Sequence, residues 1–272
     1  MLAIIWHSLP KTGLSVTATG SPDGLAALPA WPRRPARLGT AVVDVLVDRI
    51  VSGELGSGTL LPTEPRLCEA FSVSRTVIRE AVKILEQKGL VRIRQGQGTR
   101  VAVPDEWNLL DPVVLEASVR HDKDLRILDD LVEVRRALES DMAGHAAGRA
   151  TTADRADIKR LLDQLAVEVV TPGRHMLTDL EFHDVIMRAS GNRLGRAIVR
   201  TIQSEARASD RYNGYPRRAD CEASNAGHME IYDRIVAADA EGAAAAMSEH
   251  ILASWLARRR DPESRSLGGA AG

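Results

Sequence analysis

Apolar residues recur every three or four positions in two short stretches between residues 64 and 89, a pattern that predicts two helices. Thr63 is placed to cap the first helix and Ser74 to cap the second, because their side-chain oxygens can accept from free backbone N–H groups. Gly89 is placed to end the second helix in a left-handed conformation. The apolar faces consist of Leu67, Ala70 and Phe71 in the first helix and Val77, Ile78, Ala81, Val82 and Leu85 in the second.

A β-hairpin is predicted directly after these two helices. Two strand-like runs, 90–94 and 99–103, are joined by the glycine-rich turn 95–98. A further periodic stretch, 38–52, precedes the pair and predicts a third helix, with Gly53 just beyond its end. Three helices and a hairpin are the outline of a winged helix-turn-helix, which we place at residues 38–103.

The rest of the chain has helical periodicity without strand-like alternation. Residues 107–122 predict a helix or broken helix that bridges two domains. Thr151 and Asp154 have the spacing of a capping box at the start of one later helix. Helices are predicted over 125–147, 151–170, 176–189, 194–211, 219–237 and 240–259. The apolar positions assigned to the first of them are Leu128, Leu131, Val132, Val134, Leu138 and Met142. We therefore expect a mainly α protein in which an antiparallel bundle of six or seven helices, residues 104–262, follows the winged helix.

Composition limits the remaining possibilities. Residues 1–37 have several prolines and glycines and no sustained period, so we expect a disordered extension, or a start codon assigned too early; residues 263–272 predict a flexible tail. Cys68 and Cys221 are the only cysteines, which excludes a disulfide framework or a cysteine-type zinc site. No run reaches the about 20 apolar residues of a membrane span, and no signal peptide is apparent. We expect a cytoplasmic protein without membrane contact.

Charge is divided unevenly along the chain. Between Arg75 and Arg100 there are seven basic and two acidic residues, whereas residues 104–170 hold nine basic and fifteen acidic ones. A basic winged helix beside an acidic bundle is typical of a DNA reader with a separate sensor domain. Arg75, Thr76 and Arg79 fall on the first turns of the second helix of the pair, which enter the major groove when such a helix docks. An ordinary solvated helix face is the alternative, and the ordered series of cap, turn, basic helix and basic wing disfavours it.

The run LPTEPRLCEAFSVSRTVIREAVKILEQKGLVRIRQGQGTRV resembles the DNA-binding domain of the GntR family of bacterial transcription regulators. The resemblance covers about 65 residues and implies operator contacts by Arg75, Arg79 and the wing residue Gly96. The family has an arginine where Pro65 stands, and here the arginine follows at Arg66, so its contact stays open. The candidate DNA-binding residues are Arg66, Ser74, Arg75, Thr76, Arg79, Gln95 and Gly96.

Four residues of the second half form a candidate metal site. Asp179 and His183 are four apart and share one helix face, while His228 and His250 lie on two later helices with inward-pointing apolar neighbours. One carboxylate and three imidazoles suit zinc, nickel, iron or manganese. The alternative is three unrelated histidines, each packed or exposed by itself.

The segments DLEFHDVIMRASGN and GHMEIYDRIVAADAEGAAAAMSEHI are similar to the FCD effector-binding domain of the FadR subfamily of GntR regulators. The resemblance implies that Asp179, His183, His228 and His250 bind a divalent transition metal, for which we expect zinc first. It also implies that Arg135, in LVEVRRALE, helps to hold a small carboxylate effector; a structural salt bridge is the alternative role of this arginine. The bridge WNLLDPVVLEASVRHD is similar to that of regulators answering to sugar acids such as galactonate. His7, His121, His145 and His175 match nothing in the family and are expected to be surface or packing residues.

The resulting hypothesis is a homodimeric transcription regulator, a repressor, that reads a palindromic double-stranded operator and responds to a small carboxylate. A metal-dependent HD-type hydrolase is the alternative from another class, because His183 and Asp184 are adjacent; His175 and Asp210 would have to complete its site, at spacings that fit poorly. A metal site with a purely structural role is the third possibility.

Overall fold

The computed structural model describes residues 36–207, 209–214 and 217–259 of the 272-residue chain. The expectations for residues 1–35 and for the tail 263–272 lie outside the described residues. The first described helix, α1 (Ala36–Val51), begins two residues before its predicted start at Leu38.

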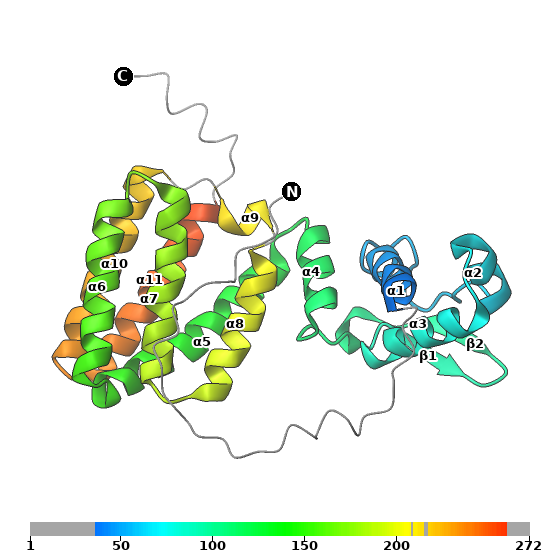
Figure 1. Cartoon of the computed structure of the whole chain (residues 1–272), viewed down its shortest axis with the longest axis horizontal. Helices are drawn as coiled ribbons and strands as arrows, with labels where there is room; N and C mark the ends of the chain where they lie inside the picture. The colour runs from blue at the N-terminus through cyan, green and yellow to red at the C-terminus, as the bar shows by residue number, and fades with distance from the viewer. Residues whose placement is uncertain (1–35, 208, 215–216, 260–272) are drawn as a thin grey trace, which may run out of the picture. The chain divides into compact units, whose positions relative to one another are not determined.

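The N-terminal part folds as the pattern predicts, with the three helices and the hairpin in the expected order (Figure 1). Helices α2 (Glu64–Phe71) and α3 (Arg75–Gln87) follow α1, and strands β1 (Val91–Arg94) and β2 (Gly98–Val101) form an antiparallel hairpin. Val91 pairs with Val101 in the register that turns both side chains into the core. The buried residues of this core include Val42, Leu46, Ile50, Leu67, Ile78, Leu85 and Leu90.

Local caps fix both ends of α3. The Ser74 hydroxyl accepts from the Val77 N–H at 3.4 Å, as predicted. At the other end Gly89 has φ +74°, and the N–H of Leu90 donates to the Leu85 carbonyl at 3.0 Å. A Cβ on Gly89 would lie 2.2 Å from the Glu106 carbonyl oxygen, so a side chain has no room there. The predicted cap of α2 is wrong in one respect: Thr63 stands at the N-cap, but its side chain makes no capping hydrogen bond.

A short connection follows the hairpin. It contains the 3₁₀ turn η2 (Pro104–Glu106) and α4 (Pro112–His121), and α4 lies within the stretch 107–122 that is predicted to be a helix or broken helix. The Asp111 carboxylate caps α4 by accepting from the N–H groups of its first turn. Helix α4 supplies buried residues to two cores, because Val114 and Ala117 pack with the winged helix and other α4 side chains with the bundle.

Seven helices form the second part, and no strand occurs in it among the described residues. They are α5 (Arg126–Arg149), α6 (Thr152–Glu168), α7 (Pro172–Ala189), α8 (Arg193–Ala206), α9 (Asp210–Asn213), α10 (Arg218–Val236) and α11 (Ala240–Arg259). The capping box of Thr151 and Asp154 is present. Helix α7 begins four residues before the prediction, because Pro172 occupies its first turn, where a missing N–H costs little.

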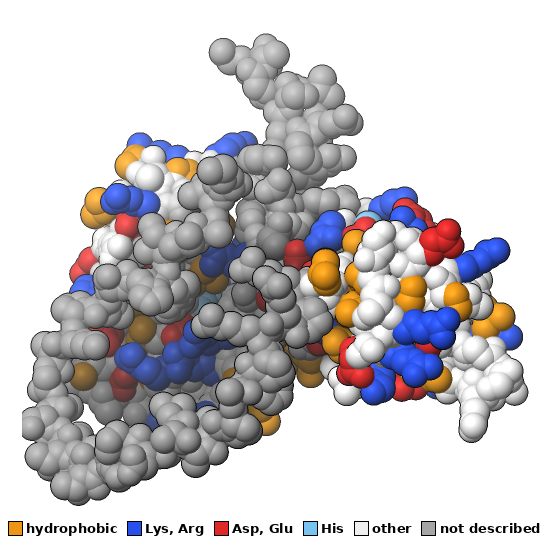
Figure 2. Space-filling model, turned by 45° about the vertical axis from the view of Figure 1, so that its right-hand side comes forward, with side chains coloured by type: hydrophobic (Ala, Val, Ile, Leu, Met, Phe, Trp, Pro, Cys, Tyr) orange, Lys and Arg blue, Asp and Glu red, His pale blue; other side chains and the backbone are white. Residues whose placement is uncertain are grey.

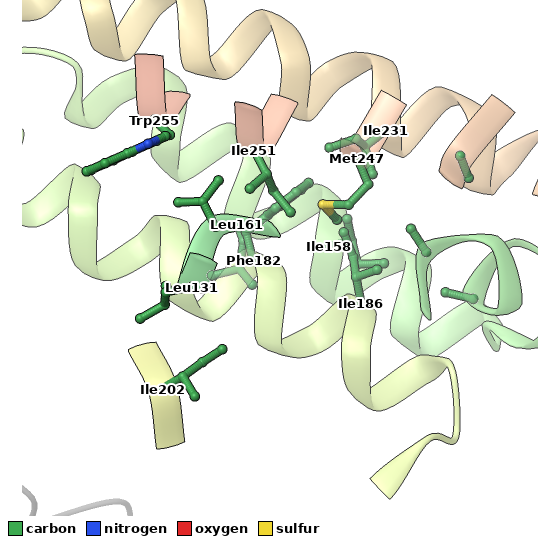
Figure 3. Close-up of a cluster of buried hydrophobic side chains, with 14 of the residues drawn as sticks. Leu131, Ile158, Leu161, Phe182, Ile186, Ile202, Ile231, Met247, Ile251 and Trp255 are labelled. Carbon is green, nitrogen blue, oxygen red and sulfur yellow. The ribbon is translucent and has the colours of Figure 1, made fainter. Parts of the chain in front are cut away.

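The bundle core brings together α5, α6, α7, α10 and α11 (Figure 3). Phe182 on α7 is fully buried and belongs to one hydrophobic cluster with Ile158 and Leu161 of α6 and Ile231 of α10. This packing fixes the rotation of α7, and therefore the direction of the residues that flank Phe182. None of the described helices is long and apolar enough to span a bilayer.

Candidate functional site

Three helices of the bundle bring the four candidate metal ligands together. Asp179 and His183 project from α7, His228 from α10 and His250 from α11. One potential ligand atom of each residue lies within 4.8 Å of those of the other three. The three histidines are buried, and the Asp179 side chain is 26% exposed, so the group faces open space on one side only.

Neighbouring side chains fix the orientation of two of the histidines. The Nδ1 of His183 lies 2.7 Å from a carboxylate oxygen of Glu139, which can only accept, so this nitrogen carries the proton. The Nδ1 of His228 lies 3.4 Å from Oδ1 of Asn225, whose amide N–H₂ donates to the Leu165 carbonyl. The Nε2 atom of each ring is therefore left with a free lone pair. Metal-binding histidines usually have a hydrogen bond of this kind at the ring nitrogen that does not bind the metal.

Among the described residues, the Nε2 atoms of the three histidines have no hydrogen-bond donor next to them from outside the group. Nε2 of His228 is buried and has no hydrogen-bond partner in the described residues, although a carboxylate oxygen of Asp179 lies 3.1 Å away. The Nε2 atoms of His183 and His250 face each other at 3.2 Å. Lone pairs that converge in this way, from three imidazoles and one carboxylate, fit a divalent transition metal by number, chemistry and burial.

The electrostatics of the group favour the protonation states that bind a cation. Burial alone would raise the pKa of the Asp179 carboxyl, but the hydrogen bond with His228 and the electrostatic attraction of the neighbouring imidazoles hold it well below its usual value. Burial lowers the pKa of His228, and it lowers that of His250 more strongly. The carboxylate is therefore ionised and these two imidazoles are neutral near pH 7, as metal binding requires.

Arg135 lies next to this group on α5. Burial opposes its charge, but the Glu139 carboxylate, 2.6 Å from its Nε, raises the pKa of Arg135 above its ordinary value. Burial likewise opposes the ionised form of Glu139, yet Arg135 and His183 hold its pKa at about 2. The Nη1 of Arg135 donates to the Tyr212 hydroxyl at 2.8 Å. A hydrogen-bonded chain, Arg135 to Glu139 to His183, therefore connects the arginine with the metal-binding group.

A cavity of about 80 Å³ joins these elements. Arg135, Asp179, His183 and His250 line it, while His228 is not part of its wall. His175, which the sequence assigned to surface or packing, also lines the cavity and is buried, with its Nε2 2.9 Å from Asn225. Sequence reasoning missed Glu139, Tyr212 and Asn225. Only Glu139 had a local signal, since it stands four residues after Arg135 on one helix.

The candidate DNA-binding residues all lie on the outside of the N-terminal part. Arg66, Ser74, Arg75, Thr76, Arg79, Gln95 and Gly96 are exposed. Arg79 on α3 is paired with Glu64 of α2, with Nε 3.0 Å from a carboxylate oxygen. Gly96 has φ +76° at the tip of the hairpin, a conformation that favours glycine. Figure 2 shows Lys and Arg side chains among acidic ones on the face of this domain that is in view.

A helix-turn-helix with an exposed basic helix, joined to a helical bundle in which four potential metal ligands converge beside a cavity, is typical of a DNA-binding regulator with a separate sensor domain. The comparisons agree: residues 38–101 match the "Bacterial regulatory proteins, gntR family" and residues 130–253 match the FCD domain. The chain belongs to the GntR family, in the FadR type with an FCD domain, and is a DNA-binding transcription regulator, not an enzyme.

Named relatives regulate in both directions. The chain is 30% identical over 213 residues to the galactonate operon transcriptional repressor of Escherichia coli, covering 78% of this chain and 93% of the relative. It is 32% identical over 177 residues to the Glc operon transcriptional activator of the same species, covering 63% and 66%. The structure of Lar from Listeria monocytogenes has the same fold, with a TM-score of 0.53, 18% identity and coverage of 84% and 99%.

The hydrolase alternative finds no support. Asp184 is bound by Arg196 of α8 through two short contacts, 2.8 and 2.6 Å, and is not one of the four converging residues. The side chain of Asp210 is outside the described residues. The adjacent His-Asp pair therefore points in two directions, as successive residues of a helix do.

Proposed function

We propose that this regulator binds a small carboxylate in the bundle cavity and that the bound acid alters its affinity for operator DNA. The observation that carries the proposal is the common cavity wall of Arg135 and three of the four candidate metal ligands. A guanidinium and a divalent cation in one small space together favour an anion, and a carboxylate has the two oxygens to meet both.

The proposed metal is zinc, with nickel, iron or manganese as alternatives for the same donors. Asp179, His183, His228 and His250 would hold it. When bound, the metal supplies positive charge and an open position for a carboxylate or hydroxyl oxygen. The Asp179 side chain is the partly exposed member of the group, so a ligand oxygen would approach the metal from its side.

Arg135 is the side chain that we propose donates a hydrogen bond to the ligand's carboxylate. Its guanidinium has five N–H groups. Glu139 accepts two of them, Tyr212 accepts one, and the Gln203 amide, with its oxygen turned toward Arg135, accepts at 2.9 Å. One Nη1 N–H then remains for the ligand, and the position of the guanidinium is fixed before the ligand arrives.

The relatives suggest the class of acid and the direction of regulation. The name of the repressor relative refers to galactonate, a hydroxylated sugar acid, and that protein aligns over nearly its full length. We therefore propose a hydroxylated carboxylate as effector and repression as the role. Two copies of the chain, each with a winged helix, would read the two halves of a palindrome through Arg66, Ser74, Arg75, Thr76, Arg79, Gln95 and Gly96.

Fluorescence anisotropy on an operator selected from random duplexes by the wild-type protein tests the proposal. Hydroxylated carboxylates added to the zinc-loaded protein should change its operator affinity at least about fivefold, the lower end of typical allosteric coupling. Arg135→Lys should abolish this response, because lysine lacks the planar donor fork. Arg136→Lys is the matched control, since Arg136 donates to Ser248 instead and does not line the cavity.

An effector response that is equal in wild type and Arg135→Lys would remove Arg135 from the ligand site. Zinc that raises the melting temperature while no carboxylate changes operator affinity would favour a purely structural metal.

A further inference from the structure

The cavity beside the metal-binding group does not end at its own wall. It continues into a groove between α10 and α11, two helices that pack side by side (Figure 1). Asp220, Ser224, His250, Ser254 and Ala257 line both spaces, so the two are continuous. The groove has about 350 Å³ of open volume, several times the 80 Å³ of the inner cavity. A ligand held at Arg135 can therefore extend past His250 into it.

His250 places at one end of the groove a ring nitrogen that forms no hydrogen bond within the described residues. Its ring is 6% exposed, and its Nε2 faces His183. The other ring nitrogen, Nδ1, has no hydrogen-bond partner in the part of the chain that the structure describes, whereas the Nδ1 atoms of His183 and His228 both have one. Because metal-binding histidines almost always donate from the second nitrogen, a group in the groove is expected to accept from it.

Gly227 of α10 packs directly against the His250 ring. A Cβ at Gly227 would lie 2.6 Å from Nδ1 of His250, closer than any real contact allows, and both residues line the groove. Glycine at this position therefore lets α10 and α11 pack closely at the level of the ring. Because His250 itself lines the groove, an acceptor bound there lies next to the ring.

Two hydroxyls stand at the junction of cavity and groove. Ser224 on α10 and Ser254 on α11 are half-buried, line both spaces, and have no side-chain hydrogen bond within the described residues. Each hydroxyl can donate and accept, which matches the hydroxyls of a ligand. The groove itself is lined by carboxylates without Lys or Arg, and Glu249 among them is in no ion pair of the described residues. A second negative charge on the ligand is therefore disfavoured at this end.

Resting on the proposed function, we propose that the α10–α11 groove is a second subsite, which binds the hydroxylated chain of a monocarboxylate whose acid end lies at Arg135. Ser224 and Ser254 are its specificity-determining residues, and a chain hydroxyl accepts from Nδ1 of His250. The regulator thereby distinguishes a long polyhydroxylated acid from a two-carbon hydroxy acid that fills the inner cavity alone.

Isothermal titration calorimetry of the full-length, zinc-loaded protein tests the subsite with glycolate as the short acid and galactonate and gluconate as the long ones. The wild type should bind at least one long acid more tightly than glycolate. Ser224→Ala with Ser254→Ala should weaken that long acid about tenfold through the loss of two neutral hydrogen bonds, while glycolate changes less than twofold. Ser254→Leu, which fills the junction, should block the long acids and leave glycolate bound.

Ser248→Ala is the matched control, because Ser248 lies on the same helix, bonds to Arg136 and lines neither space. Zinc content should equal that of the wild type in every variant. If the double variant and the leucine variant keep the wild-type ratio of long to short acid, the subsite is wrong and the proposed function stands. If the wild type binds none of the three acids, both are wrong.

Discussion

The three buried histidines differ in what holds their second ring nitrogen, although the sequence treats them alike. A carboxylate holds that of His183, an amide oxygen holds that of His228, and no described group holds that of His250. A carboxylate acceptor makes an imidazole more basic than an amide does. The metal ligands are thus unequal, and His250 is the one whose partner a bound ligand can supply.

Protonation of these residues should make the metal-free protein sensitive to acid. The folded-state pKa values of His228 and His250 lie below the ordinary 6.5, chiefly because burial disfavours charge. The unfolded chain therefore binds more protons as the pH falls below about 6.5, and stability is lost in that direction. Urea unfolding of chelator-treated protein should give a smaller free energy of unfolding at about pH 5 than at about pH 8.

The double variant His228→Ala, His250→Ala serves as the reference for this measurement, since it lacks both groups and should show a shallower loss over the same interval. A free energy of unfolding that is constant or rises toward pH 5 in the wild type would contradict the buried, neutral state of the two rings.

At the scale of elements, helix α3 presents the residues that we expect to read DNA. Its inner face is buried through Ile78 and Leu85, and its cap at Ser74 fixes where the helix begins, so Arg75 stands in its first turn and faces outward. Arg79 one turn later is shared with Glu64, which orients it but also competes with any base contact. Arg75 has no such ion pair among the described residues, so its side chain is freer than that of Arg79 to contact a base.

Arg75→Ala should therefore weaken operator binding by about 1–3 kcal/mol and relax sequence preference at one position, if its fork reads a guanine. Lys83→Ala is the control on the same helix, because Lys83 lies two turns later and pairs with Glu80. Binding-site selection and anisotropy measure both effects. Unchanged affinity and unchanged preference in Arg75→Ala would exclude this residue from base readout.

Helix starts and caps that depend on neighbouring residues in the sequence could be predicted well, whereas features that depend on tertiary packing could not. The periodic stretch 240–259 gave the start of α11 correctly, and Ser74 and Thr151 gave their caps, because spacing and capping act within one turn. Val134, counted among the apolar positions of its helix, is instead 42% exposed. Helix α8 ends at Ala206, not at the predicted residue 211.

The residues of the candidate site likewise fall into some that the sequence predicted and some that it did not. The four metal-binding residues were predicted through a family resemblance, which carries long-range information that periodicity lacks. The contacts of Glu139 with His183 and of Arg135 with Tyr212 join residues 44 and 77 positions apart, so no local rule reveals them. The close approach of Gly227 to the His250 ring joins two different helices, which only the coordinates display.

On the scale of the whole molecule, the metal-binding group ties together helices that are distant in sequence. Asp179 and His183 come from α7, His228 from α10 and His250 from α11, and Glu139 connects them to α5. A metal that binds only the folded chain stabilises it by mass action, by about 2.7 kcal/mol at 100 times its dissociation constant. Without the metal, the converging lone pairs of the four residues repel one another. Removal of the metal should therefore destabilise the bundle.

Purified protein should therefore carry about one transition-metal ion per chain, and a chelator should lower its melting temperature. His228→Ala should lose the metal and the chelator response together, because this buried Nε2 has no other partner in the described residues. His145→Ala is the matched control: His145 is an exposed histidine of α5 beside Asp141, and its removal should leave the metal in place. Metal analysis and calorimetry measure the two quantities. Native protein without metal, or a chelator response that His228→Ala retains in full, would show that the four residues are not a metal site.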